Sequence, residues 1–186
     1  FLFVGLWGQG PFGEDRKDVG NTIKIFCESF ANKKDQPGLI LKTSGAGFGI
    51  IEKTQVLEKI KSIKNGFPSS VSLPPIYLLH GSLSGEEMNK LYNHPKVKCM
   101  INLGHGEGFG RPMLEATMTG LPVMASGWSG HLDFLPNKYT TLVSGDIVDV
   151  PKSQHWKDLI QEGSKWFNVN PKDAYSGFCE IFQNYS

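Results

Sequence analysis

The chain has 186 residues, of which 39% are hydrophobic and 20% are charged, and its net charge is +1. This length fits one domain with a sizeable hydrophobic core, and we treat residues 1–186 as that single domain. The near-neutral charge argues against nucleic acids and membrane surfaces as partners. No apolar run reaches the roughly 20 residues that span a bilayer, so we expect no transmembrane segment.

The three cysteines, Cys27, Cys99 and Cys179, are widely spaced and lack the histidine partners of a metal site. We therefore expect buried thiols in a reducing compartment, which predicts a cytoplasmic protein without a disulfide framework. The sequence opens directly in an apolar, strand-like run and has no initiator methionine. This start predicts that the chain is a fragment, the C-terminal part of a longer protein.

Strand and helix patterns alternate along the first half of the chain. We expect strands at 1–4, 39–41 and 76–79 and helices at 19–31 and 53–63. In the second of these helices, the spacing of the apolar residues predicts that Val56, Leu57, Ile60 and Ile63 lie on one side. Ser84 and Glu87 have the spacing of a capping box, which predicts a short helix ending near Tyr92.

The second half continues the alternation. We expect strands at 97–103, 121–125 and 141–143 and helices from Pro112 onward, at 131–135 and at 171–185. Pro112 suits the first turn of a helix, where a missing N–H costs nothing. Asn170 and Pro171 fit the N-cap and first position of the last helix. Residues 144–170 show no clear pattern, and we predict no element there.

Strands that alternate with helices predict an α/β fold with a mostly parallel sheet and helices on both faces. In such sheets, ligands bind outside the carboxyl ends of the strands, where the strand order reverses. We place this crevice at the strand 97–103 and the loop that follows it.

The most informative segment runs from Gly106 to Ala116 and reads GEGFGRPMLEA. Three glycines that alternate with Glu107 and Phe109 cannot form a regular element, so the segment begins as a loop and leads into a helix. Such a loop directs backbone N–H groups and the positive end of a helix dipole at one place. That place suits a phosphate or a sugar hydroxyl, and the sequence therefore predicts a ligand site.

Glu107 and Glu115 are separated by seven residues, and Gly-Leu-Pro-Val-Met-Ala-Ser follows at 120–126. This ordered set resembles the signature of retaining glycosyltransferases of the GT-B fold, the glycosyltransferase group 1 type. The resemblance is sharp over 97–134 and faint after 144. It implies a Rossmann-like domain, one half of a GT-B fold, that binds a nucleotide-diphosphate sugar with UDP or GDP. It also implies a separate N-terminal domain, absent from this chain, for an unknown glycan, lipid or small-molecule acceptor.

The resemblance also implies roles for single residues. Glu107 would face the donor sugar near the developing oxocarbenium ion, and Lys17 would neutralise the diphosphate leaving group. Glu115 would accept hydrogen bonds from both ribose hydroxyls. The remaining donor-binding positions are Gly108, Phe109, Gly110, Arg16, Ser129 and Gly130. We expect positive φ angles at Gly108 and Gly110. Gly127 and Gly130 form either a second cradle of N–H groups, which we favour, or a tight turn.

Several of these residues also have a simpler interpretation. Taken singly, Glu107 fits a carboxylate that favours a helix start, and Glu115 fits a solvated helix residue. Asp133 matches the position of a frequent family glutamate, or is a capping or surface residue. His105 is a candidate general base, but we favour a strand-end hydrogen bond for it.

The chain departs from the family pattern in two places. The family has a basic residue soon after the first strand, whereas residues 6–9 are uncharged here. Either Arg16 substitutes for it, with Lys42 as another candidate, or the affinity for the donor is reduced. The serine that precedes the first glutamate of the family is also replaced, by the Gly-His-Gly of residues 104–106. No Asp-x-Asp pair occurs in the sequence. We therefore expect metal-independent transfer without a cofactor.

Three functions follow from these patterns. The first is the donor-binding half of a retaining hexosyltransferase, which we expect to be inactive without its N-terminal domain because half of the cleft is missing. The second is a module that binds a nucleotide or a sugar phosphate without catalysing transfer. The third and weakest is a sugar-nucleotide epimerase of the same fold.

Overall fold

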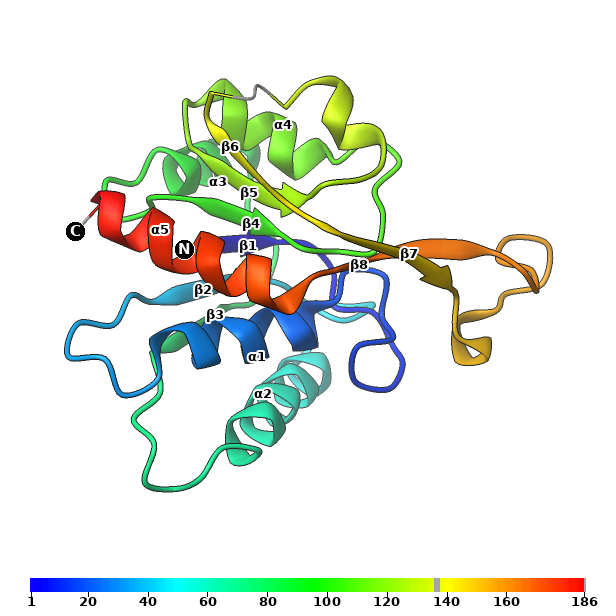
Figure 1. Cartoon of the computed structure of the whole chain (residues 1–186), viewed down its shortest axis with the longest axis horizontal. Helices are drawn as coiled ribbons and strands as arrows, with labels where there is room; N and C mark the ends of the chain where they lie inside the picture. The colour runs from blue at the N-terminus through cyan, green and yellow to red at the C-terminus, as the bar shows by residue number, and fades with distance from the viewer. Residues whose placement is uncertain (136–137, 186) are drawn as a thin grey trace.

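The computed structural model describes residues 1–135 and 138–185. In this part of the chain, six parallel strands form one sheet in the order β3-β2-β1-β4-β5-β6 (Figure 1). The strands are β1 (Leu2–Val4), β2 (Leu39–Lys42), β3 (Ile76–Leu79), β4 (Met100–Asn102), β5 (Val123–Ser126) and β6 (Thr140–Val143). The expected α/β, Rossmann-like fold is confirmed, and this sheet is parallel throughout.

Helices cover both faces of the sheet, as predicted. They are α1 (Val19–Phe30), α2 (Ile50–Asn65), α3 (Gly85–Tyr92), α4 (Arg111–Met118) and α5 (Pro171–Tyr185), with 3-10 turns η1 (Gly130–Asp133) and η2 (Lys152–Gln154). Helices α1, α2 and α5 contribute to one hydrophobic core, and α3 and α4 contribute to the other (Figure 1). Successive strand residues supply opposite cores, because side chains alternate across a strand. In β1, Leu2 belongs to the α3–α4 core and Phe3 to the larger one.

Local sequence signals explain where several helices begin. The N–H of Glu87 donates to Oγ of Ser84 at 3.2 Å and the N–H of Ser84 donates to the Glu87 carboxylate at 2.7 Å, so the predicted capping box is confirmed. At the start of α5, the Asn170 side chain accepts from the N–H of Lys172 at 2.9 Å, as expected for an N-cap. Pro171 is the first residue of this helix.

Two expectations about single elements were wrong. Helix α2 is longer than predicted. Val56 and Ile60 are both buried, in agreement with the predicted side, but Leu57 is 47% exposed and does not belong to it. Cys27 and Cys99 are buried free thiols as expected, but Cys179 is partly exposed. It lies on α5, whose buried side is formed by other residues.

An antiparallel hairpin was not predicted at all. Strands β7 (Gly145–Asp149) and β8 (Lys165–Val169) pair with each other and extend past the carboxyl ends of the parallel strands (Figure 1). Most residues of β7 are at least partly exposed, so β7 lacks the apolar alternation that marks a strand. The hairpin is attached through Phe167 and Val169 of β8, which join the larger core. It stands beside the crevice that the sequence placed at the end of β4.

Candidate functional site

The strand order reverses between β1 and β4, and the loops that follow these two strands meet there. The N–H of His105 donates to the carbonyl of Arg16 at 2.9 Å. A Cβ on Gly104 would lie 3.0 Å from the same Arg16 oxygen, a tight contact, so glycine favours the close approach of the two loops. The topology therefore brings residues about 90 positions apart to the edge where ligands bind in folds of this kind.

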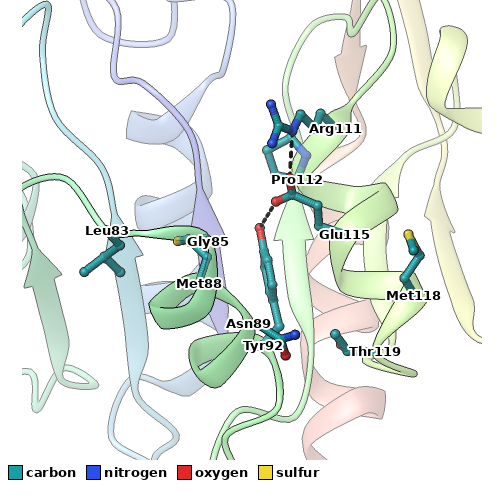
Figure 2. Close-up of a pocket in the computed structure, with 10 residues that line it drawn as sticks. All are labelled: Leu83, Gly85, Met88, Asn89, Tyr92, Arg111, Pro112, Glu115, Met118 and Thr119. Carbon is teal, nitrogen blue, oxygen red and sulfur yellow. Dashed lines mark hydrogen bonds and ion pairs between the residues drawn. The ribbon is translucent and has the colours of Figure 1, made fainter.

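Glu115 lines a cleft of about 650 Å³ between α3 and α4 (Figure 2). The Arg111 Nε donates to its Oε1 at 2.7 Å, and the Tyr92 hydroxyl donates to its Oε2 at 3.2 Å. Burial raises the pKa of Tyr92, and the negative charge of Glu115 raises it further, so the phenol stays a donor. The Glu115 side chain is 34% exposed, which leaves it accessible from the cleft. The sequence did not single out Tyr92 or Arg111, although the i,i+4 spacing of Arg111 and Glu115 was a readable signal.

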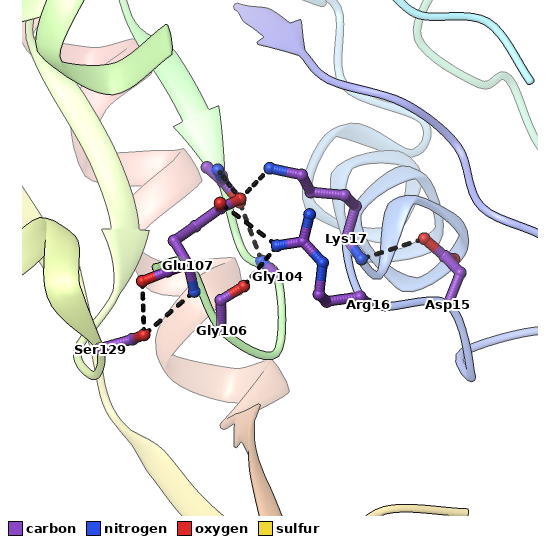
Figure 3. A network of polar contacts seen from close by, with 8 residues as sticks. Asp15, Arg16, Lys17, Gly104, Gly106, Glu107 and Ser129 are labelled. Carbon is purple, nitrogen blue, oxygen red and sulfur yellow. Dashed lines mark hydrogen bonds and ion pairs between the residues drawn. The ribbon is translucent and has the colours of Figure 1, made fainter. Parts of the chain in front are cut away.

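Glu107 turns instead toward the loop after β1 (Figure 3). Its Oε1 accepts from Lys17 Nζ and from Asn102 Nδ2, the latter at 3.2 Å, and its Oε2 lies 3.3 Å from Arg16 Nη1. Arg16 Nη1 also donates to the carbonyl of Gly106 at 2.8 Å. The structure thus joins three predicted residues, Glu107, Lys17 and Arg16, in one network, while Glu115 lines a different cavity.

Asn102 is a network member that the sequence analysis missed. It ends β4 and is almost fully buried. Its Oδ1 accepts from the N–H of Gly104 at 3.2 Å while its Nδ2 reaches Glu107. An amide at the end of an otherwise apolar strand was the available signal, because a buried polar side chain needs partners.

Burial governs the charge of Lys17. Lys17 is only 9% exposed, and this burial lowers its pKa to about 8. The neighbouring positive charge of Arg16 lowers the pKa as well. Asp15 opposes the shift, and its carboxylate accepts the N–H of Lys17 at 3.1 Å. An anion beside a buried ammonium stabilises its charged form, and it does so more strongly than at an exposed site.

Ser129 holds the glycine loop in place. Its Oγ accepts from the N–H of Glu107 at 3.0 Å and donates to the Glu107 carbonyl at 2.7 Å (Figure 3). The N–H of Gly130 donates to the same carbonyl at 3.0 Å, and the N–H of Gly127 donates to Val143 at 2.8 Å. The expected N–H cradle of Gly127 and Gly130 is therefore wrong, because both donors are used within the chain. Gly130 instead permits close packing of two loops.

The remaining loop residues lead into α4. Gly110 is its N-cap with φ 79°, as expected for a left-handed position, and Pro112 lies in the first turn. Gly108 does not have the positive φ that we expected. Phe109 is 58% exposed, with its ring 5.5 Å from that of Phe134. An apolar ring at this edge is open to a ligand.

His105 connects the crevice to the hairpin. Its Nδ1 lies 2.9 Å from the Phe167 carbonyl, its Nε2 lies 3.2 Å from the Gly13 carbonyl, and its ring stacks on Trp166 at 3.9 Å. Its Nε2 also lies 4.0 Å from Oδ1 of Asp18, which is buried as well. Burial raises the pKa of Asp18 to about 6, while the His105 charge lowers it. These contacts agree with the strand-end hydrogen bonding that we favoured for His105.

Two further candidates lie outside this network. Lys42 donates from Nζ to the carbonyl of Gly81 at 2.7 Å, which ties it to the loop after β3. Asp133 is exposed at the end of η1. Within the described residues, no group of three or more His, Cys, Asp or Glu side chains could hold a metal ion. Every helix of that part of the chain is too short or too polar to cross a membrane.

Comparison with known proteins gives a structural likeness without a sequence match. No family model and no curated protein matches the sequence. A chain of the GtfA/B complex aligns over 100% of this chain with a TM-score of 0.55 and 15% identity, and the alignment covers 29% of that chain. The likeness shows a shared fold. A second match is the C-terminal domain of LpcC, a glycosyl transferase group 1 family protein from Francisella tularensis, at 15% identity and a TM-score of 0.49. It aligns over 98% of this chain and 74% of that domain structure.

Proposed function

We propose that this chain is the donor-binding domain of a retaining glycosyltransferase and that it binds a nucleotide-diphosphate sugar, UDP- or GDP-linked. The observation that carries the proposal is the network of Lys17, Arg16 and Glu107 at the point where the strand order reverses. Two basic side chains and a carboxylate meet there beside a glycine loop. This is the chemistry that a diphosphate and a sugar hydroxyl need.

In this proposal the ion pair is a resting arrangement. The diphosphate takes the place of the Glu107 carboxylate on Lys17, and the lysine then neutralises the charge that develops on the leaving group. Arg16, whose side chain is 57% exposed, supplies the positive charge that residues 6–9 lack. The released Glu107 faces the donor sugar and stabilises positive charge at the reacting carbon. No metal or cofactor is needed for these steps.

The ribose is assigned to Glu115. Its carboxylate is already oriented by Arg111 and Tyr92, so little side-chain freedom is lost when two hydroxyls bind. The cleft between α3 and α4 then receives the nucleoside. An acceptor-binding domain that closes over this face is required for transfer, so we expect the isolated chain to bind donor and to transfer negligibly.

The test is calorimetric titration of UDP, GDP and ADP into the wild-type chain and into Glu115→Gln. This variant keeps the size of the side chain and removes its charge. Glu86→Gln is the matched control, because Glu86 forms the same kind of i,i+4 ion pair with Lys90 but lies outside both cavities. We expect one nucleotide to bind saturably, with at least tenfold weaker binding in Glu115→Gln alone. Equal binding by the two variants would contradict the assignment of the ribose.

A binding module without catalysis is the second candidate. It is favoured by the uncharged residues 6–9 and by the engagement of Glu107 with both Lys17 and Arg16. The two functions are separated by attaching an acceptor-binding domain of this fold and measuring sugar transfer. Transfer that is lost in Lys17→Met supports the enzyme, whereas nucleotide binding without transfer supports the module.

A further inference from the structure

A second cavity, of about 510 Å³, lies between the glycine loop and the β7–β8 hairpin. Glu107 lines it on the loop side, Trp128 follows β5, and Trp166 and Leu159 come from the hairpin region. We call this cavity the hairpin pocket. It shares Glu107 with the proposed donor site but does not include Glu115.

The indole rings of the hairpin pocket are held in place by neighbouring rings. Trp166 stacks on His105 with centroids 3.9 Å apart and an angle of 16° between the planes. Trp128 stacks on Phe167 at 6.2 Å and 13°. Because His105 is itself bonded to two carbonyls, the Trp166 ring has little freedom to turn. The pocket therefore presents apolar surface that is ordered before any ligand binds, most of it from Trp128, which is 37% exposed, and little from Trp166, which is 7% exposed.

Trp166 also carries an unused donor. It is 7% exposed, and its Nε1 is buried without a hydrogen-bond partner. A buried indole N–H normally has an acceptor, so an orphan one needs an explanation. A ligand that packs beside the ring and brings an oxygen to it supplies one.

Polar groups surround these rings. Glu107 provides acceptor oxygens, and Arg16, Gln154 and Lys165 provide donors along the same cavity. Flat apolar faces bordered by hydrogen-bonding groups match a pyranose ring, which has C–H faces and a rim of hydroxyls. These groups already have partners in the chain, such as Arg16 for Glu107 and Asp149 for Lys165. Carboxylate, guanidinium and ammonium groups can each form further hydrogen bonds, which saccharide hydroxyls use and an apolar peptide does not, so the pocket favours a saccharide.

We propose that the hairpin pocket binds a pyranose ring of a saccharide acceptor, placed by Trp128 and Trp166 next to Glu107. The inference rests on the proposed function, since it names the acceptor class for the same site. It assigns a role to the hairpin, which lies in the part of the chain where the glycosyltransferase resemblance is faint. Glu107 then lies between the donor on the Lys17 side and the acceptor on the hairpin side.

The experiment uses the full chain labelled with ¹⁵N and four disaccharides: maltose, cellobiose, chitobiose and α-1,2-mannobiose. The four tryptophans give four indole N–H signals. We expect saturable shifts of the Trp166 and Trp128 signals with at least one disaccharide. The signals of Trp7 and Trp156, which do not line the hairpin pocket, should stay in place.

Two variants of equal exposure then test the location. Leu159 is 68% exposed and lines the pocket, whereas Trp156 is 67% exposed and does not line it, so neither change threatens the fold. We expect Leu159→Ser to weaken saccharide binding about tenfold and Trp156→Ser to leave it unchanged. Equal effects of the two variants would place the saccharide elsewhere and overturn the inference.

Nucleotide titrations keep the two proposals apart. If none of the four disaccharides shifts Trp166 while a nucleotide still binds through Glu115, the hairpin pocket is not a saccharide site and the proposed function stands. If a disaccharide binds in the pocket but no nucleotide binds, the donor assignment fails. The pocket is then a saccharide site, but the saccharide is not an acceptor, and the inference is overturned in that respect.

Discussion

Gly130→Ala should destabilise the fold through a single atom. The new Cβ would lie 2.1 Å from the carbonyl oxygen of Gly108, and real Cβ atoms essentially never approach closer than 3.0 Å. The oxygen belongs to backbone, so one of the two loops must move by about 1 Å. Overpacking of this kind costs about 1–3 kcal/mol, and loss of the hydrogen bond from Gly130 to Glu107 adds about 1 kcal/mol. We expect a total loss of about 2–4 kcal/mol in the free energy of unfolding.

The assay is urea denaturation followed by tryptophan fluorescence, with Gly108→Ala as the matched control. A Cβ at Gly108 would meet nothing within 4 Å, and its φ is not in the left-handed region, so this variant should stay within about 0.5 kcal/mol of wild type. In a domain of this size, a loss of about 3 kcal/mol lowers Tm by about 6–12 °C. A Gly130→Ala chain as stable as Gly108→Ala would refute the close packing of the two loops.

Three further predictions test the network of Glu107 with Lys17 and the buried side of helix α2. Glu107→Gln should cost about 1–3 kcal/mol of stability at pH 7, because Lys17 stays buried without its anion. Burial lowers the pKa of Lys17 to about 8, so this lysine is mostly neutral at pH 9. Urea titrations at pH 9 should therefore show a smaller loss of stability. The affinity for UDP should fall above pH 8 by up to about tenfold per pH unit, since neutral Lys17 cannot pair with a diphosphate, and calorimetry should find no such fall in Lys17→Arg. Val56→Ala should cost about 1–3 kcal/mol, whereas Leu57→Lys should change Tm little, because only Val56 is buried; similar Tm losses would place Leu57 in the core.

Much of the fold was readable from the sequence because its signals are local. The periodicity of residues 19–31 predicted helix α1, and Ser84 with Glu87 marked the start of α3. The glycine loop before α4 was readable for the same reason, since positive φ at Gly110 and proline in the first turn are properties of adjacent residues. Alternation of such segments is enough to predict a parallel α/β sheet.

The arrangement of the site was decided only by tertiary structure. Lys17 and Glu107 are 90 positions apart, and they meet because β1 and β4 are neighbours in the sheet. The hairpin was invisible because β7 is largely exposed and β8 is anchored by contacts with distant segments, such as that between Phe167 and His105. Sequence patterns report which side of an element is apolar. They do not report which distant polar group will meet a given carboxylate, because that depends on strand order and on how closely two loops can pack.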